Sequence, residues 1–206
     1  MGSHSISSSS LAEPLAVLPP PPIVPARAEH SRFVQRIRRR YAAELGLLPP
    51  GLPRRDTIAA LIGRLQAGGR PLGSAMRVAR QLVLERLAVL DIEAEAPMSD
   101  ITCAMTELAE ATLDCALAHG QLELDARHGA PRNEAGERID FWVVGMGKLG
   151  ARELNVSSDI DLVYVYEEDG HTDGASPISA HEYFSQLAKS LYTLIGEAPS
   201  VWPSSS

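Results

Sequence analysis

Two aspartates in the last quarter of the chain have the type and spacing of a metal site. Asp159 and Asp161 are separated by a single isoleucine. In a strand, alternate side chains project from the same face, so both carboxylates would lie on one face. Neighbouring carboxylates repel each other unless a cation lies between them. Hard oxygen ligands suit Mg²⁺, which also neutralises the charge that builds up in phosphoryl transfer. We therefore expect Mg²⁺ as the cofactor, with Asp159 and Asp161 as metal ligands and catalytic residues.

A glycine-rich turn shortly before the aspartates offers positions for phosphate. Gly145, Gly147 and Gly150 allow backbone conformations that are closed to other residues. Successive amide groups in such a turn can form a concave donor site for an anion. Lys148 adds a positive charge within the turn. This segment is therefore expected to bind nucleotide phosphates.

Two common phosphate motifs fit this segment poorly. A Walker-type loop requires Ser or Thr after its lysine, whereas Lys148 is followed by Leu149. The three glycines do spell the GxGxxG pattern of a dinucleotide-binding fold, and Glu167 stands roughly where a ribose-binding acid would be. However, only residues 151–158 separate the last glycine from the next strand, and a crossover to a parallel strand needs about a dozen residues or more. The spacing argues against both motifs, and dinucleotide binding remains an alternative to test.

A nucleotidyltransferase layout accounts for every polar residue of the segment. It consists of a strand at Ile139–Val144, the Gly-Lys turn with a short helix, and a second strand at Asp159–Tyr166 that contains both aspartates. A loop at 167–176 leads to a helix that Ser179 caps and that continues through Ile195. The apolar spacing of this helix indicates that it covers the sheet, which would then have two strands.

The segment resembles a known enzyme family. The run GMGKLGARELNVSSDIDLVYVYE is similar to the signature of the bifunctional glutamine synthetase adenylyltransferase and adenylyl-removing enzymes, which belong to the DNA polymerase beta-like nucleotidyltransferase superfamily. Those enzymes contain two such domains, and this chain resembles the amino-terminal, adenylyl-removing one. The resemblance covers roughly residues 30 to 197. It implies an α+β fold, with an amino-terminal helical bundle segment followed by a partial polymerase beta-like nucleotidyltransferase domain.

The resemblance also assigns roles to individual residues. Gly147 and Lys148 occupy the superfamily's Gly-Ser or Gly-Gly position, and Ser157 and Ser158 would offer hydroxyls to phosphate or nucleotide oxygens. The two aspartates take the place of the paired metal ligands. A third carboxylate is expected on a later strand within an Arg-Val-Asp-Leu-Arg-Leu-Arg-Pro stretch, which this sequence does not contain. The irregular end of the sequence suggests a truncation or a shift of reading frame.

The implied function is the control of glutamine synthetase. The parent enzyme would remove AMP from a tyrosine of glutamine synthetase with inorganic phosphate, releasing ADP, and would add AMP from ATP at its second domain. The expected partners are glutamine synthetase, a PII-type signalling protein, ATP or ADP, and phosphate. Besides dinucleotide binding, an inactive fragment that binds glutamine synthetase or its regulator is an alternative, because the third carboxylate is missing.

The composition excludes several other classes. A net charge of -7 argues against a non-specific nucleic-acid binder, whose affinity depends on positive charge. No apolar run approaches the roughly 18 residues of a membrane span, and the amino terminus lacks the pattern of a secretion signal. Cys103 and Cys115 stand alone, which indicates neither a disulfide framework nor a zinc site. A reduced, cytoplasmic setting is expected.

The rest of the chain is expected to position the site. The predicted organisation is a disordered Ser/Pro-rich arm at 1–30, a helical segment at 31–130, the partial nucleotidyltransferase domain at 131–197 and an irregular tail at 198–206. Apolar spacing predicts helices from Ser31 to before Pro49, from Asp56 to Gln66, from Leu72 to Glu93 and from Ser99 to His119, followed by a loop flanked by His119 and His128 and a turn-rich link at 131–136. Solvation explains Asp173, and a favourable helix dipole explains Glu182.

Overall fold

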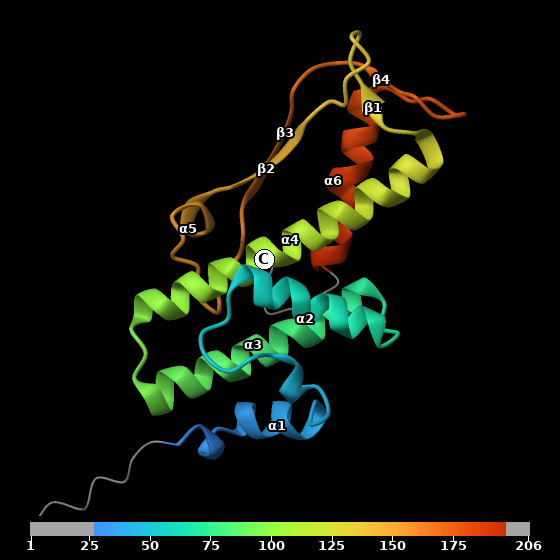
Figure 1. Ribbon diagram of the computed structural model, residues 1–206. Helices are drawn as coiled ribbons and strands as arrows, with labels where there is room; N and C mark the ends of the chain where they lie inside the picture. The colour runs from blue at the N-terminus through green and yellow to red at the C-terminus, as the bar shows by residue number, and fades with distance from the viewer. Residues whose placement is uncertain (1–26, 197–206) are drawn as a thin grey trace, which may run out of the picture.

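The computed structural model describes residues 27–196 (Figure 1). The predictions for residues 1–26 of the arm and for the tail at 198–206 lie outside these described residues. The last residues of the predicted arm are ordered, since Ala28–His30 forms a short 3-10 helix. Ala28 is fully buried, and its backbone N–H donates to Glu93 Oε1 at 2.9 Å.

Four helices build the amino-terminal part of the described chain. They are α1 (Arg32–Arg40), α2 (Arg55–Ala67), α3 (Leu72–Ala94) and α4 (Met98–His128), with a 3-10 turn, η2, at Leu45–Leu47. Helix α3 packs against α1, α2 and α4 and supplies many of the buried apolar side chains of the main core. The prediction for α3 is confirmed to within one residue at its end. Thr57 helps to begin α2, because its hydroxyl accepts from the backbone N–H of Arg54 at 2.9 Å.

The first predicted helix is shorter than expected. It ends at Arg40, and Tyr41 leaves the helical region with φ -121° and ψ 35°. The break lets the following leucines, among them Leu45 and the buried Leu48, pack against the main core. A continuous helix to Pro49 would have turned part of this apolar set towards solvent.

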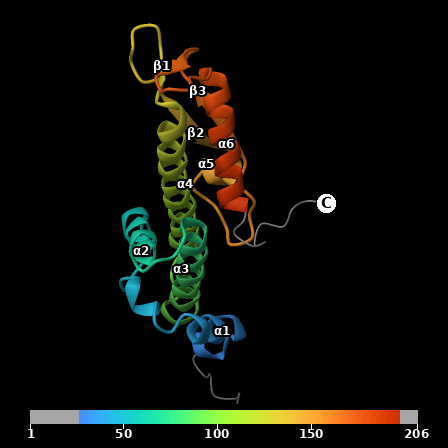
Figure 2. The ribbon, with the colours of Figure 1, turned by 90° about the vertical axis from the view of Figure 1, so that its right-hand side faces the viewer.

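Helix α4 is longer than expected, so the loop predicted between His119 and His128 is wrong. The helix continues through His128. Gly120, which follows the predicted helix end at His119, permits a close helix contact. A Cβ at Gly120 would lie 2.8 Å from Leu187 Cδ1 of the last helix. Figure 2 shows that last helix, α6 (Ala180–Gly196), lying beside the carboxy-terminal half of α4.

Two antiparallel strand pairs follow the helices. Strands β2 (Phe141–Gly145) and β3 (Leu162–Tyr166) pair with Phe141 opposite Tyr166 and Gly145 opposite Leu162. The turn-rich link and the loop at 167–176 also contain short strands, β1 (Pro131–Arg132) and β4 (His171–Thr172), which pair with each other. The predicted α+β class is confirmed.

An ion pair stabilises the second strand pair. Asp173 accepts a hydrogen bond from Arg132 and a second one at 2.8 Å from the backbone N–H of Ala130. These contacts, the bond from Arg132 first, lower the pKa of Asp173. Asp173 is exposed, as the expected solvation requires, and the structure adds these two partners.

Helix α6 covers one face of the β2–β3 pair, as predicted. Phe184 stacks on Phe141 and on Tyr166, with ring centroids 5.0 Å apart in both pairs. Ser179 caps the helix, because its hydroxyl accepts from the backbone N–H of Glu182 at 3.1 Å. Within the described part of the chain, none of the helices combines the length and apolarity that a membrane span requires.

Candidate functional site

The glycine-rich turn folds tightly back on the end of β2. A single helical turn, α5 (Gly147–Gly150), follows Met146. Gly147 has φ +53°, a left-handed conformation that favours glycine. A Cβ at Gly150 would lie 2.5 Å from the carbonyl oxygen of Gly145, which leaves no room for a side chain. The glycine spacing is therefore explained by the compactness of the turn, whether or not a phosphate binds there.

Lys148 faces the loop that leads to the aspartates. Its Nζ lies 3.5 Å from Ser158 Oγ. Ser158 is buried and donates its hydroxyl to Asn155 Oδ1 at 2.7 Å, whereas Ser157 is exposed and donates its backbone N–H to the same oxygen at 3.1 Å. Asn155 thus organises both serines. Sequence reasoning missed this residue, although an Asn two residues before a turn serine is a known turn signal.

Asp159 and Asp161 lie in an extended segment immediately before β3. The prediction that they lie within the strand was wrong, because β3 begins at Leu162. The last backbone bond of the pairing runs from the N–H of Met146 to the carbonyl oxygen of Asp161 at 2.9 Å. Beyond that point the chain after β2 turns away into α5, so Asp159 has no strand to pair with. Asp161 is nevertheless held directly beside the glycine-rich turn.

The two carboxylates follow the alternation that was predicted. Asp159 and Asp161 are exposed, whereas Ile160 and Leu162 between and after them are half-buried against the main core. The same alternation continues along β3, where Val163 is exposed. Both aspartate side chains therefore leave the same side of the extended backbone.

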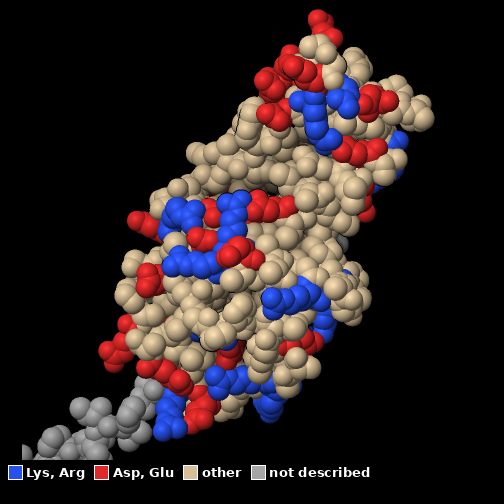
Figure 3. Space-filling model, viewed as in Figure 1, with Lys and Arg blue, Asp and Glu red and all other residues tan. Residues whose placement is uncertain are grey.

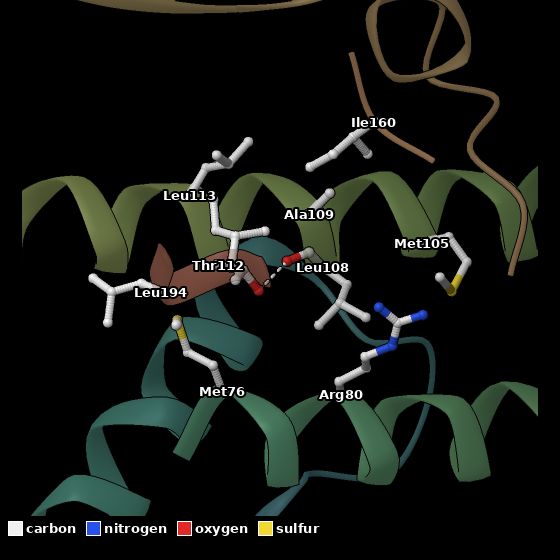
Figure 4. A pocket seen from close by; sticks show the side chains of 10 residues that line it. Met76, Arg80, Met105, Leu108, Ala109, Thr112, Leu113, Ile160 and Leu194 are labelled. Atoms are coloured by element: carbon white, nitrogen blue, oxygen red, sulfur yellow. Dashed lines mark hydrogen bonds between the residues drawn. The ribbon is translucent and has the colours of Figure 1, made fainter. Parts of the chain in front are cut away.

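Ile160 anchors the aspartates to the helices. Its side chain lines an apolar pocket between α3, α4 and the end of α6, and Figure 4 shows it directed towards Ala109 and Leu113 of α4. The Thr112 hydroxyl in this pocket donates to the Leu108 carbonyl oxygen at 2.8 Å and so presents no unpaired group. Because Ile160 points into the core, the carboxylates before and after it point away from the core. Burying these charges without partners would be costly.

Arg80 borders the same pocket from α3. Burial lowers the pKa of its guanidinium from the usual value, because the charged form loses solvation.

A network of ion pairs ties the turn to the helical segment. Arg152, which follows α5 with φ +60°, pairs with Glu107 at 2.9 Å and with Glu110 at 2.6 Å. Arg55 at the start of α2 pairs with Asp114 at 2.6 Å, and its hydrogen bond to that carboxylate raises its pKa. Figure 3 shows basic and acidic side chains intermingled in the middle of the molecule.

This network was missed by sequence reasoning. Its signal was present, since Glu107, Glu110 and Asp114 recur on α4 at the three- and four-residue spacing of one helix face. The arginine partners come from α2 and from the segment after α5, and no local pattern links those segments.

The donor set suits a hard divalent cation. Two exposed carboxylates on one side of an extended segment provide oxygen ligands of the type that Mg²⁺ prefers, with room for water or phosphate at the remaining positions. Among residues 27–196 there is no group of three or more His, Cys, Asp or Glu side chains arranged to hold a metal. A metal here would therefore rely on Asp159, Asp161 and ligands from outside the described chain.

The antiparallel pairing of β2 and β3 decides between the dinucleotide-binding and the nucleotidyltransferase interpretations of the glycine-rich segment. A dinucleotide-binding βαβ unit needs parallel neighbours joined by a crossover, whereas β2 and β3 are antiparallel. The GxGxxG pattern therefore does not belong to that fold.

Comparison with known proteins agrees with the resemblance. Residues 53–201 match the family model described as glutamate-ammonia ligase adenylyltransferase. The relatives of similar sequence include three proteins named bifunctional glutamine synthetase adenylyltransferase/adenylyl-removing enzyme. The one from Burkholderia mallei is 46% identical over 153 residues, covering 69% of this chain and 16% of that protein. The one from Ralstonia nicotianae is 38% identical over 188 residues, 86% of this chain and 20% of the relative. The one from Chromobacterium violaceum is 45% identical over 128 residues, 62% of this chain and 14% of the relative.

The chain thus spans about a fifth or less of the length of these relatives. The matched residues include α2 to α6, the glycine-rich turn and both aspartates. On this match, the chain belongs to the glutamate-ammonia ligase adenylyltransferase family.

Proposed function

We propose that this chain forms the helical support and the metal-binding part of an adenylyl-removing site within a nitrogen-regulating enzyme. The observation that supports this most is the position of Asp161, whose backbone is bonded to the glycine-rich turn while its carboxylate and that of Asp159 are exposed. The family membership adds the substrate, because the relatives are named for adenylylation and adenylyl removal on glutamine synthetase. Activity of the whole enzyme is a proposal here, since the chain matches a small part of each relative.

The reaction is phosphorolysis of an adenylylated tyrosine. An oxygen of inorganic phosphate attacks the phosphorus of the tyrosyl adenylate, the bond from phosphorus to the tyrosine oxygen breaks, ADP leaves, and the tyrosine oxygen takes up a proton. When bound, Mg²⁺ neutralises charge that develops on the phosphoryl oxygens. Asp159 and Asp161 would hold that ion.

The turn and its neighbours would hold the phosphates. Backbone amides of the turn at Gly145 and Gly147 supply donors, and Lys148 supplies a positive charge. The expected donor at Gly150 instead bonds within the turn, to the carbonyl oxygen of Met146 at 3.2 Å. Ser157 is exposed, and its hydroxyl, which donates to Asn155 Oδ1 at 3.3 Å in this structure, would turn to a phosphate oxygen. Ser158 is buried against Asn155, so its part is to position the loop and Lys148.

We further propose that the site acts in the cytoplasm under a PII-type regulator. Both cysteines are unpaired and partly buried, which suits a reducing compartment. Glutamine synthetase and the regulator would contact the parent enzyme, with ATP, ADP and phosphate as its small ligands.

Calorimetric titration of the 206-residue chain with ADP tests the site. We expect binding that requires Mg²⁺ and that weakens by about tenfold to hundredfold in Asp159→Asn and in Asp161→Asn, the effect of losing a charged ligand. Asp169→Asn is the matched control, because Asp169 is exposed beyond the opposite end of β3. NAD should not bind.

Two results would redirect the proposal. Equal weakening by Asp169→Asn would show that general charge, and not the aspartate pair, attracts the complex. Absence of Mg²⁺-dependent ADP binding, together with retained binding of glutamine synthetase, would favour the inactive binding fragment.

A further inference from the structure

A basic groove lies between α1 and α3, away from the glycine-rich turn. Five arginines line it: Arg36, Arg40, Arg70, Arg77 and Arg80. The remaining lining residues are neutral, and they include the hydroxyl-bearing Tyr41 and Ser74. The groove has a volume of about 530 Å³, within the range of sites for small molecules. In Figure 3, basic side chains lie over α1 at the lower end of the molecule, with acidic side chains beside them.

Arg36 and Arg40 provide the clearest positive charge. They are four residues apart on α1 and therefore share one face of the helix. Each guanidinium lies over an aromatic ring, Arg36 over Phe33 at 5.8 Å and Arg40 over Tyr41 at 5.5 Å. Among the residues that the structure describes, neither has a carboxylate partner within ion-pair distance.

Arg70 reaches the groove from the start of the α3 segment. It forms an ion pair with Glu44, so its charge is partly offset. Arg77 and Arg80 line the groove as well, but the inference rests on Arg36, Arg40 and Arg70.

The positive charge of this groove is opposite in sign to the net charge of the chain. Like charges at a four-residue spacing on a helix repel each other and reduce its stability. The whole chain has a net charge of -7, so an anion is not drawn to its surface in general. An anion seated between the guanidinium groups would remove the repulsion, because their planar forks donate in pairs to phosphate oxygens.

We propose that this groove binds a small anion with several phosphate groups, either a polyphosphate or the polyphosphate part of a nucleotide. The guanidinium groups of Arg36, Arg40 and Arg70 contact the phosphates, and Ser74 and Tyr41 donate hydroxyl hydrogens to the same oxygens. The site shares no lining residue with the glycine-rich turn. Because the arginines supply the positive charge, binding needs no divalent cation, in contrast to the proposed adenylyl-removing site.

Calorimetry on the full chain in the presence of EDTA tests this site separately. Inorganic tripolyphosphate and ATP are titrated in parallel, with AMP as the single-phosphate comparison. We expect tripolyphosphate to bind at one site per chain, with AMP at least tenfold weaker. Affinity for ATP above that for tripolyphosphate would assign the groove to a nucleotide, and equal affinity would assign it to the polyphosphate group itself.

Variants assign the binding to the groove. The double variant Arg36→Gln/Arg40→Gln should weaken tripolyphosphate binding by at least tenfold. The control Arg32→Gln/Arg39→Gln removes the same charge from exposed positions of α1 that do not line the groove, and it should weaken binding by less than threefold. Far-ultraviolet circular dichroism confirms that α1 is retained in both variants.

The proposal fails if tripolyphosphate does not bind without metal, or if both double variants weaken binding equally. If the Arg36→Gln/Arg40→Gln variant loses helix content, Arg70→Lys is used instead, because it keeps the charge and removes the fork. Unchanged tripolyphosphate binding in Arg70→Lys would then overturn the contact assigned to Arg70. None of these outcomes depends on the aspartate site, because EDTA removes its metal.

Discussion

The helical segment and the β2–β3 pair differ in how completely their apolar side chains are covered. Helices α1 to α4 enclose a main core in which side chains such as Leu61, Leu82 and Val83 are almost fully buried. The strand pair has one face under the aromatic rings of α6, while Trp142 and Val165 on the other face are 47% and 42% exposed. The helices therefore form a fully packed support. The sheet has one solvent-exposed face, and Asp159 and Asp161 project from the same side as that face.

The largest effect should come from the core of the helical segment. Leu82→Ala removes a side chain that is 2% exposed, and we expect it to lower the free energy of unfolding by about 2–5 kcal/mol. The control Leu122→Ala, at a position 71% exposed on α4, should change it by less than about 0.5 kcal/mol. Urea unfolding followed by circular dichroism measures both. Similar losses in the two variants would contradict the picture of one well-packed core.

A smaller effect is expected at the tight turn beside the site. Gly150→Ala places a methyl group against the carbonyl oxygen of Gly145, which should cost about 1–3 kcal/mol of stability and weaken Mg²⁺-dependent ADP binding. Gly46→Ala is the control, because a Cβ there meets nothing within 4 Å. Full stability and full ADP binding in Gly150→Ala would mean that the turn is looser than its geometry shows.

A pH-dependent effect on stability is expected where α6 packs against α4. Burial, together with the bond from the Tyr183 hydroxyl to Asp125 Oδ1 at 2.6 Å, raises the pKa of Tyr183 above its usual value. The folded chain therefore keeps this proton when the unfolded chain has lost it. Stability should fall as the pH rises above about 10, the pKa of an unperturbed tyrosine.

The variant Tyr183→Phe separates this effect from other alkaline changes. It should lose about 1 kcal/mol near neutral pH, because one hydrogen bond disappears while Arg138 still pairs with Asp125 at 2.8 Å. Its stability should decline less steeply above pH 10, as measured by urea unfolding across pH 7 to 11. A decline as steep as that of the wild type would assign the alkaline sensitivity to another group.

The smallest effect should come from the open face of the sheet. Val165→Thr keeps the branched shape of an exposed strand residue, so the free energy of unfolding should change by less than about 0.5 kcal/mol. Thermal unfolding checks this. A loss above 1 kcal/mol would show that this face is covered in solution, for example by a second copy of the chain.

The parts of the fold that local patterns govern could be predicted from the sequence. Helix α3, the cap at Ser179 and the two central strands follow from apolar spacing and capping chemistry. The continuation of α4 beyond His119 could not be predicted in this way, because the close contact between Gly120 and Leu187 joins segments that are distant in the sequence.

The candidate site also has some features that the local sequence predicts and others that depend on tertiary packing. The exposure of Asp159 and Asp161 follows from the alternation around Ile160, which the sequence displays directly. The start of β3 after both aspartates depends on where β2 ends, and the contacts of Arg152 with α4 depend on tertiary packing. No local sequence pattern predicts either the start of β3 or the contacts of Arg152.

The central claim is that Asp159 and Asp161 together hold one divalent cation beside the glycine-rich turn. Electron paramagnetic resonance of Mn²⁺, titrated into the 206-residue chain with saturating ADP, counts bound ions directly. The account predicts one bound Mn²⁺ per chain, lost in Asp159→Asn/Asp161→Asn and retained in Asp169→Asn. Undiminished Mn²⁺ binding in the double variant would contradict it.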